Sequence, residues 1–262
     1  MTTRQKEVRD PDRFIALNEI VDNRWEVTRV LGEGGFGAVY EVKDVKSSSN
    51  ETFAMKVEST KAPSHEQVLK MDVNILRRLR AKSSQHFTKF VTAGKTDRVH
   101  YMVTSLVGPN LNDLKRRCKG KFRPRTVAHV AIGSLQGLKE MHEINYLHRD
   151  IKPPNLAIGR PPNFPGVHFS FQARTLPMRE QIKRVGALKE EMNGHPEDLM
   201  NGCPVEFLEL HAHISKLHYS SDPDYDLLEK AMRKLEDRRK KPEKDGDQLE
   251  WEVFLEAESL KS

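Results

Sequence analysis

A glycine-rich hairpin near the N-terminus constrains the fold of this chain more than any other feature. Residues 32–39 read Gly-Glu-Gly-Gly-Phe-Gly-Ala-Val, and β-forming segments lie on both sides. The glycines let the backbone approach a phosphate closely and direct its N–H groups toward it. A dinucleotide-binding fold needs a helix directly after such a loop. Because this loop leads into a strand, we do not expect that fold.

A lysine inside an apolar strand is the second unusual feature. Lys56 lies within the strand predicted over residues 52–58, and its plain interpretation is an edge-strand residue that opposes aggregation. The helix predicted to begin at Pro63 carries Asp72 on its apolar face. A buried acid is costly unless it is paired. We therefore expect Asp72 to pair with Lys56, which would then hold the α- and β-phosphates of a nucleotide.

Residues 148–155, His-Arg-Asp-Ile-Lys-Pro-Pro-Asn, form the most specific motif of the chain. In a phosphoryl-transfer centre Asp150 would accept or orient the proton of a substrate hydroxyl. Lys152 would neutralise charge on the transferring phosphoryl group, and Asn155 would bind Mg²⁺ through its amide oxygen. The three motifs, in this order, indicate protein-kinase ancestry.

Hydrophobic periodicity outlines the remaining elements. Further strands are predicted at 25–30, 38–45, 87–93 and 99–106, and helices at 126–144 and 214–235. The buried stripe of the first of these two helices is expected to contain Val127, Val130, Ala131, Leu135, Leu138 and Met141.

Composition limits the compartment and the partners. No apolar run approaches the roughly 20 residues of a membrane span, and the first residues lack the apolar stretch of a signal peptide. Cys118 and Cys203 provide neither a disulfide framework nor metal-ligand spacing. The cytoplasm, or the nucleus, is therefore the expected location, with no membrane contact.

The charge balance is basic. A net charge of +6 favours anionic partners such as nucleotides and acidic or phosphorylated proteins, although a solvated basic surface explains it equally well. No nucleic-acid-binding motif is present, so we expect no nucleic-acid partner. We expect a monomer.

Three motifs together resemble the casein kinase 1 superfamily, in particular the tau–tubulin kinases and their nematode-type relatives. They are Gly-Glu-Gly-Gly-Phe-Gly-Ala-Val-Tyr at 32–40, Val-Leu-Lys-Met-Asp-Val at 68–73 and His-Arg-Asp-Ile-Lys-Pro-Pro-Asn-Leu-Ala-Ile-Gly-Arg at 148–160. The resemblance extends from Trp25 to Trp251 through shorter matches at 176–177, 204–207, 213–215, 223–225 and 249–252.

This resemblance implies an α+β, bilobal protein-kinase-like fold. An N-terminal tail would cover residues 1–24, a β-rich N-lobe residues 25–107, and a shortened α-helical C-lobe residues 108–262. The implied activity is transfer of the γ-phosphate of ATP, with Mg²⁺, to Ser or Thr hydroxyls of protein substrates.

The resemblance also implies roles for individual residues. Lys56 would be the lysine of the third strand and Asp150 the catalytic base. Thr104 would be the gatekeeper, and the backbone of Leu106 would meet the adenine at the hinge. The expected nucleotide contacts are Gly32, Gly34, Gly35, Gly37, Val39, Ala54, Lys56, Asp72, Thr104 and Leu106.

Two departures from the family pattern stand out. Asp72 replaces a glutamate and is one methylene shorter, so the ion pair requires the helix to lie closer to the strand. Between Arg160 and Leu176, residues 161–175 replace an Asp-Phe-Gly motif, an activation segment, a substrate-binding loop and a buried central helix. No Asp or Glu occurs between Asp150 and Glu180, and Ser170-Phe171-Gln172 is the only candidate remnant of the metal-binding motif.

Three hypotheses therefore remain open. The chain is a casein kinase 1-like serine/threonine kinase, or a pseudokinase that binds nucleotide or a partner without transfer. The third hypothesis is a truncated isoform or gene-model fragment without independent activity, because residues 161–175 resemble neither flank.

Overall fold

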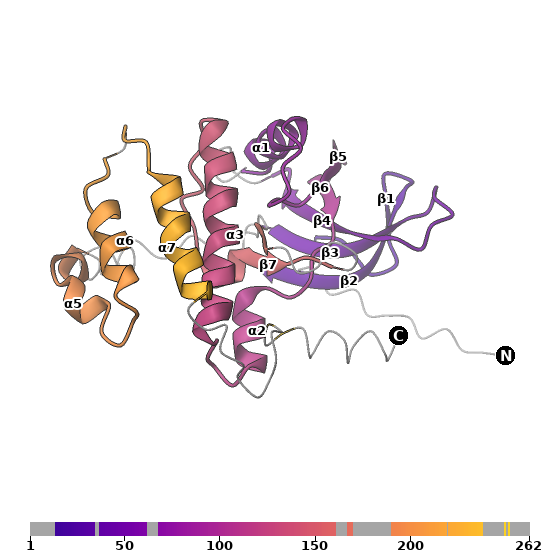
Figure 1. The fold of residues 1–262 in the computed structure, drawn as a ribbon. Coiled ribbons are helices and arrows are strands. Elements are labelled where there is room, and N and C mark those ends of the chain that lie inside the picture. The colour runs from indigo at the N-terminus through magenta and orange to yellow at the C-terminus, as the bar shows by residue number, and fades with distance from the viewer. Residues whose placement is uncertain are drawn as a thin grey trace. The chain divides into compact units, whose positions relative to one another are not determined.

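The computed structural model describes residues 14–34, 37–61, 68–160, 167–169, 190–218, 220–237, 249 and 251. The described residues up to Gly108 form one compact unit, and a second unit begins at Pro109. The first unit is a curled antiparallel sheet with one helix, and the second is mainly helical (Figure 1). This is the α+β kinase-like fold predicted from the sequence.

The sheet of the first unit has six strands in the order β1-β2-β3-β4-β6-β5, with every pairing antiparallel. The glycine-rich hairpin joins β2 to β3, so the loop is followed by a strand as expected. The strands are β1 (Ile20–Val21), β2 (Trp25–Gly34), β3 (Gly37–Asp44), β4 (Thr52–Ser59), β5 (Phe90–Lys95) and β6 (Val99–Ser105).

The two faces of this sheet have different roles. Successive side chains alternate between faces, and cross-strand partners share a face. One face buries an apolar cluster, formed by Ile15, Val21, Trp25, Val27, Ala38, Tyr40, Val42, Met55, Val57, Val99, Tyr101 and Val103. Lys56 alternates with Met55 and Val57, so its side chain lies on the opposite face.

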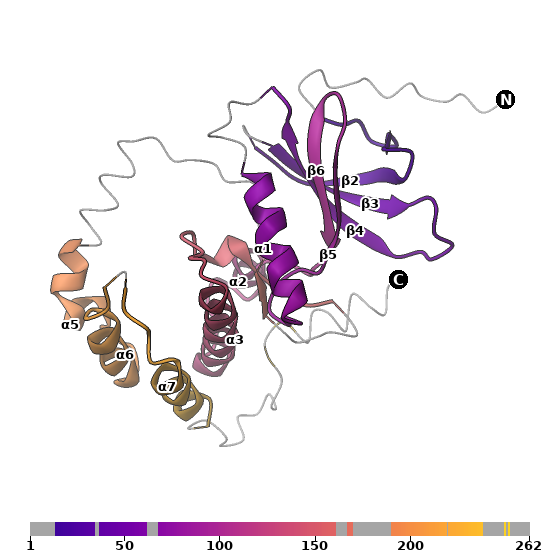
Figure 2. The ribbon, with the colours of Figure 1, turned by 90° about the horizontal axis from the view of Figure 1, so that it is seen from above.

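The helix α1 (Leu69–Ala81) packs against β4, β5 and β6 (Figure 2). The predicted start at Pro63 lies outside the described residues, and in the structure Val68 is the N-cap of α1. The buried residues are Leu69, Asp72, Val73, Ile75, Leu76 and Leu79.

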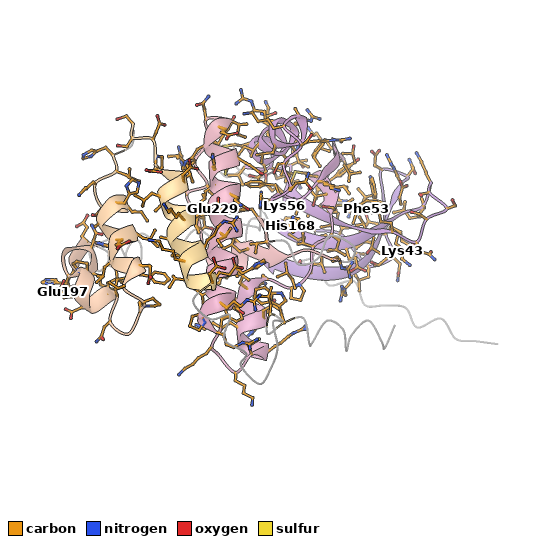
Figure 3. All side chains as sticks on the ribbon, in the orientation of Figure 1. Lys43, Phe53, Lys56, His168, Glu197 and Glu229 are labelled. Carbon is orange, nitrogen blue, oxygen red and sulfur yellow. The ribbon has the colours of Figure 1, made fainter. Side chains whose placement is uncertain are left out.

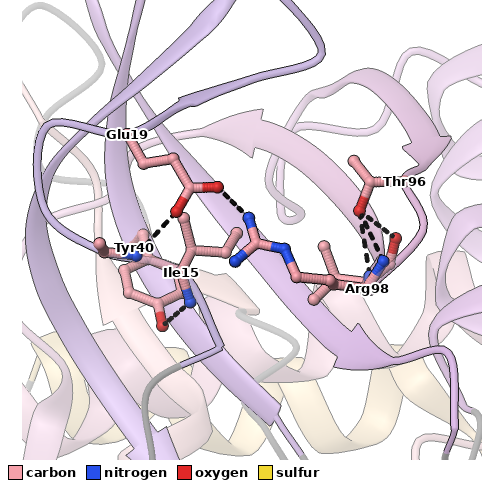
Figure 4. Close-up of polar contacts among 7 residues, drawn as sticks. Ile15, Glu19, Tyr40, Thr96 and Arg98 are labelled. Carbon is pink, nitrogen blue, oxygen red and sulfur yellow. Dashed lines mark hydrogen bonds and ion pairs between the residues drawn. The ribbon is translucent and has the colours of Figure 1, made fainter. Parts of the chain in front are cut away.

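Residues 14–24 correct the expectation of a tail that ends at residue 24. The Ile15 side chain is buried, and its backbone N–H donates to the hydroxyl of Tyr40 at 3.3 Å. Glu19 forms an ion pair with Arg98, which lies at the turn before β6 (Figure 4). This segment therefore belongs to the core of the first unit from residue 14 onward.

The second unit is organised around one long helix. It contains α2 (Leu111–Arg117), α3 (Pro124–Glu143), the short 3-10 helix η1 (Pro153–Asn155), β7 (Leu156–Ile158), β8 (Val167–Phe169), α5 (Pro196–Leu199), α6 (Glu206–Ile214) and α7 (Tyr225–Asp237). Pro124 opens α3 at a position where its missing N–H costs nothing. None of the helices that the structure describes is both long and apolar enough to cross a lipid bilayer.

The helices α3 and α7 pack side by side (Figure 1). Their apolar core, with one residue from α6, contains Ala128, Ile132, Leu210, Leu228, Ala231, Met232 and Leu235. Gln136 on α3 also donates to Glu229 on α7 at 3.2 Å.

Two sequence predictions in this unit are wrong in detail. The helix predicted over 214–235 is wrong at its beginning: α6 ends at Ile214 and α7 begins at Tyr225, where Asp224 accepts the Leu227 N–H at 2.9 Å directly after Pro223. The buried stripe of α3 includes Met141 as predicted but not Val127, which is exposed. Ala128 and Ile132 are the buried centre of the face that meets α7, and the predicted Ala131 and Leu135 pack against it partly buried.

The contact between His142 and Tyr225 makes the packing of α3 on α7 sensitive to pH. His142 Nδ1 lies 2.6 Å from the Tyr225 hydroxyl. Burial lowers the pKa of His142 from its ordinary value of 6.5, because it disfavours the charged imidazolium. The folded state therefore binds this proton less tightly than the unfolded chain, and the free energy of unfolding falls as the pH drops below about 6.5.

We expect His142→Asn to flatten this dependence in urea unfolding curves recorded at pH 5.5 and 7.5 by circular dichroism. The matched control is Tyr225→Phe, which removes the hydroxyl beside Nδ1 but keeps the aromatic ring that packs on His142. Because the imidazole stays buried, this variant should keep most of the wild-type pH dependence. If His142→Asn left the difference in unfolding free energy between pH 5.5 and 7.5 unchanged, another group would control the acid sensitivity.

Candidate functional site

Four of the residues predicted to contact nucleotide share one face of the sheet. Val39 on β3 is the register partner of Lys56 on β4, and Ala54 on β4 is the partner of Thr104 on β6. Lys56 and Ala54 are two residues apart on one strand, so all four side chains lie on the same side of the sheet. Lys56 is labelled in Figure 3.

Lys56 and Asp72 form the ion pair that the sequence predicts. The Nζ atom lies 2.7 Å from Oδ2, and the two side chains are 5% and 3% exposed. The shorter aspartate therefore reaches the lysine at ordinary hydrogen-bond length. Because both charges are buried, each depends on the other for its stability.

Gly37 has no room for a side chain, whereas a Cβ atom on Gly32 would meet nothing within 4 Å. Gly32 pairs with Val39, and Gly34 pairs with Gly37. A Cβ atom on Gly37 would lie 2.2 Å from the carbonyl oxygen of Val57, so no side chain fits there. Gly35 lies outside the described residues.

Thr104 and Leu106 lie at the end of β6 and just beyond it. Thr104 is buried, and its hydroxyl donates to the carbonyl of Ser105 at 3.3 Å. Leu106 is half-buried in the segment that follows β6. Nucleotide contacts of these two residues stay predictions.

The second unit holds Asp150, Lys152 and Asn155 together. Asn155 is buried, and its Nδ2 donates to the backbone carbonyl and to Oδ2 of Asp150, both at 2.8 Å. Lys152 Nζ lies 3.0 Å from the same Oδ2. The carboxylate of Asp150 is thus fixed through one oxygen, while in the described part of the chain no hydrogen bond occupies Oδ1.

Backbone geometry and packing support this loop. Arg149 has a φ of +64°, a left-handed conformation that is uncommon outside glycine and concentrates at functional sites. The neighbouring His148 is buried, its ring centroid is 5.3 Å from that of Phe169, and Nδ1 accepts the Asp150 N–H at 3.3 Å. His148 therefore packs inside the second unit and helps to hold the loop that carries Asp150.

A magnesium site is only partly represented in the described residues. Asn155 offers a neutral amide oxygen, since its Nδ2 is committed to Asp150. Mg²⁺ binds charged oxygens and needs near-octahedral coordination. The candidate metal-binding remnant at residues 170–172 lies outside the described residues. Asn155 and the neighbouring groups that the structure describes therefore do not form a complete Mg²⁺ site.

The sequence analysis missed one buried acid on the lysine face. Glu58 lies two residues after Lys56 on β4 and is 3% exposed. The signal was available, because residues at i and i+2 of a strand face the same side. A second acid beside a predicted buried lysine is therefore expected to share its surroundings.

The fold and these motifs define a protein-kinase domain. Comparison with known families agrees: the pattern of the protein kinase domain matches residues 25–164, more than half of the chain. The chain belongs to the protein kinase family.

The chain is similar to curated kinases of Caenorhabditis elegans and Dictyostelium discoideum. A putative serine/threonine-protein kinase of Caenorhabditis elegans is 39% identical over 148 residues, which are 56% of this chain and 42% of the relative. A probable serine/threonine-protein kinase of Dictyostelium discoideum is 35% identical over 56% of the chain and 29% of the relative. A putative casein kinase I of C. elegans is 31% identical over 55% and 42%. The matching part thus spans less than half the length of each of these relatives.

The buried ion pair predicts a clear stability pattern. Asp72→Ala leaves the Lys56 charge buried without its partner and should lower the free energy of unfolding by about 3–5 kcal/mol. Adding Lys56→Met to this variant should recover most of the loss, because an apolar pair needs no compensation. Urea unfolding of the full chain measures both values.

The matched control is the pair of Arg29 and Glu41, which lie 2.6 Å apart on the same sheet with the arginine 63% exposed. Glu41→Gln should cost only about 0–1 kcal/mol, as surface pairs do. If the loss of unfolding free energy in the double variant equalled the sum of the losses of Asp72→Ala and Lys56→Met measured singly, the two charges would not depend on each other.

Proposed function

We propose that this chain is a casein kinase 1-like serine/threonine protein-kinase domain, which binds ATP and transfers its γ-phosphate to Ser or Thr hydroxyls of proteins. The buried ion pair between Lys56 and Asp72 carries this proposal. A buried lysine held by an acid, on the same face as a glycine-rich hairpin, is suited to phosphate binding.

The first unit would bind the nucleotide. The ammonium of Lys56, oriented by Asp72, would contact the α- and β-phosphates, and backbone N–H groups of the hairpin would face the remaining phosphate oxygens. Val39 and Ala54 would flank the adenine, with Thr104 and Leu106 at its outer edge. Mg²⁺ would enter as part of the Mg-ATP substrate and shield the phosphate charge.

The second unit would receive the protein hydroxyl. Asp150 is held through Oδ2 by Asn155 and Lys152, which leaves Oδ1 to accept the hydroxyl proton. Lys152 would offset negative charge as the phosphoryl group moves. A rigidly held acceptor supports transfer because its orientation is set before the substrate arrives.

The relatives support the substrate class. Two of them are named serine/threonine-protein kinases and one a casein kinase I. We extend this to the present chain as protein substrates with Ser or Thr, in the cytoplasm or nucleus, acted on by a monomer.

A second candidate function is nucleotide binding without transfer. The specific observation in its favour is the absence of Asp and Glu between Asp150 and Glu180 in the sequence. Losing a metal-binding carboxylate would raise the barrier to transfer, and every ~1.4 kcal/mol lowers the rate tenfold.

Sequencing the transcript across residues 160–176 would test the third hypothesis, a truncated isoform or gene-model fragment.

Two measurements on the full chain separate these functions. Mg-ATP should raise the melting temperature of the wild type, and radiolabelled phosphate should be transferred to an acidic protein substrate. Asp150→Asn should reduce transfer by about 100- to 10,000-fold, as expected for loss of a general base. The same variant should keep the ATP-dependent shift in melting temperature.

Each outcome of the melting and transfer measurements distinguishes between the candidate functions. A melting shift without any transfer establishes the second candidate in place of the kinase activity. Transfer that survives Asp150→Asn would remove Asp150 from the mechanism. The absence of both a shift and transfer in the wild type would overturn the proposed nucleotide-dependent function.

A further inference from the structure

Glu58 connects the lysine strand to the beginning of α1. Its buried carboxylate accepts the backbone N–H of Leu69 at 3.0 Å through Oε2. Leu69 is the first residue of α1, whereas Glu58 is the penultimate residue of β4. The bond therefore ties the helix to the strand that carries Lys56.

The helix α1 needs this acceptor because it has no cap of its own. The first N–H groups of a helix have no partner within the helix. The N-cap residue Val68 makes no side-chain capping bond. Glu58 supplies the oxygen from the sheet instead, and its negative charge suits the positive end of the helix dipole.

Glu58 also packs against the end of the glycine-rich hairpin. It is the register partner of Gly37 across β3 and β4. A Cβ atom on Gly37 would lie 3.6 Å from the Cγ of Glu58. The same side chain therefore contacts the last hairpin glycine and the first turn of α1.

The placement of Leu69 determines how closely Asp72 approaches the sheet. Asp72 lies three residues after Leu69, which is nearly one helical turn, so the two face the same side. An aspartate is one methylene shorter than a glutamate, yet Asp72 reaches Lys56 at 2.7 Å. A helix whose first turn is bonded to β4 meets the requirement for closer approach.

We propose that Glu58 is a positioning residue that holds the first turn of α1 against β4, so that the short side chain of Asp72 can orient Lys56. In its consequences for nucleotide binding, this inference rests on the proposed function. As a statement about the placement of α1, it stands on the contacts of the first unit alone.

The electrostatics fit a positioning role rather than a gain in stability. Burial raises the pKa of Glu58 from its ordinary value of 4.5, and the charge of Asp72 acts in the same direction. Bonds from the N–H groups of Leu69 and Val68, and the charge of Lys56, oppose this shift. With a raised pKa the folded state binds the proton more tightly, so the charged carboxylate costs stability as the pH rises above about 4.5.

A double-mutant cycle tests the inference on the full chain. Glu58→Met removes the acceptor but keeps an apolar side chain of similar length. We expect it to weaken Mg-ATP binding about tenfold, within the usual range of coupling between neighbouring residues. In an Asp72→Glu background, where the longer acid reaches Lys56 without help, the same substitution should change affinity by less than about threefold. Isothermal titration measures all four affinities.

Glu58→Gln is the conservative control, because its amide oxygen can still accept the Leu69 N–H. It should bind Mg-ATP within about threefold of the wild type. An equal loss from Glu58→Met in both backgrounds, or no loss in either, would overturn the coupling between Glu58 and Asp72. A loss in Glu58→Gln as large as in Glu58→Met would overturn the role of the hydrogen bond.

Hydrogen exchange keeps the inference separate from the proposed function. Without nucleotide, Glu58→Met should increase amide exchange in residues 69–73 and leave α7, in the other unit, unchanged. If the wild type does not bind ATP, the proposed function fails while this exchange result still decides the role of Glu58. Unchanged exchange at residues 69–73 would overturn the positioning role.

Discussion

The buried ion pair between Lys56 and Asp72 is the interaction on which the first unit depends. Taking two charges out of water is expensive, and their attraction offsets this cost only when the geometry is good. The sheet register fixes the lysine beside Val39, and α1 must bring the acid to it. The strand pairing, the helix position and the face of the sheet are therefore linked through one contact of 2.7 Å.

In the second unit, the carboxylate of Asp150 is likewise held by neighbouring polar groups. Asp150 is partly exposed, but one of its oxygens is held by the amide of Asn155 and by Lys152. The left-handed backbone of Arg149 and the buried ring of His148 fix the loop that carries it. Asp72 and Asp150 are thus each held by residues of their own unit.

The sequence predicts best where a physical conflict has only one resolution. An acid on an apolar helix face requires a cation, and this reasoning leads to Lys56. The sequence predicts less where several arrangements satisfy the same pattern. Periodicity alone does not show whether Val127 or Ala128 faces a partner helix whose position is unknown. The start of α7 just after Pro223 could have been inferred from the missing N–H of proline. The burial of Ile15 could have been inferred from its apolar side chain. The role of Glu58 depends on where the first turn of α1 lies, which strand periodicity does not specify.

The charge pattern explains why nucleotide binding and phosphoryl transfer must be judged separately in this chain. Under the proposed function, nucleotide binding would draw on the hairpin backbone and on Lys56, whose ion pair with Asp72 is in place in the first unit. Transfer also requires negative oxygens that hold a metal ion as charge moves. In the described part of the second unit, Asn155 contributes one neutral oxygen, and the Oδ2 atom of Asp150 is already committed to Lys152 and Asn155. Under the proposed function, the described groups of the second unit therefore provide a proton acceptor in Asp150 but leave the need for metal-binding carboxylates unmet, so transfer can fail where nucleotide binding succeeds.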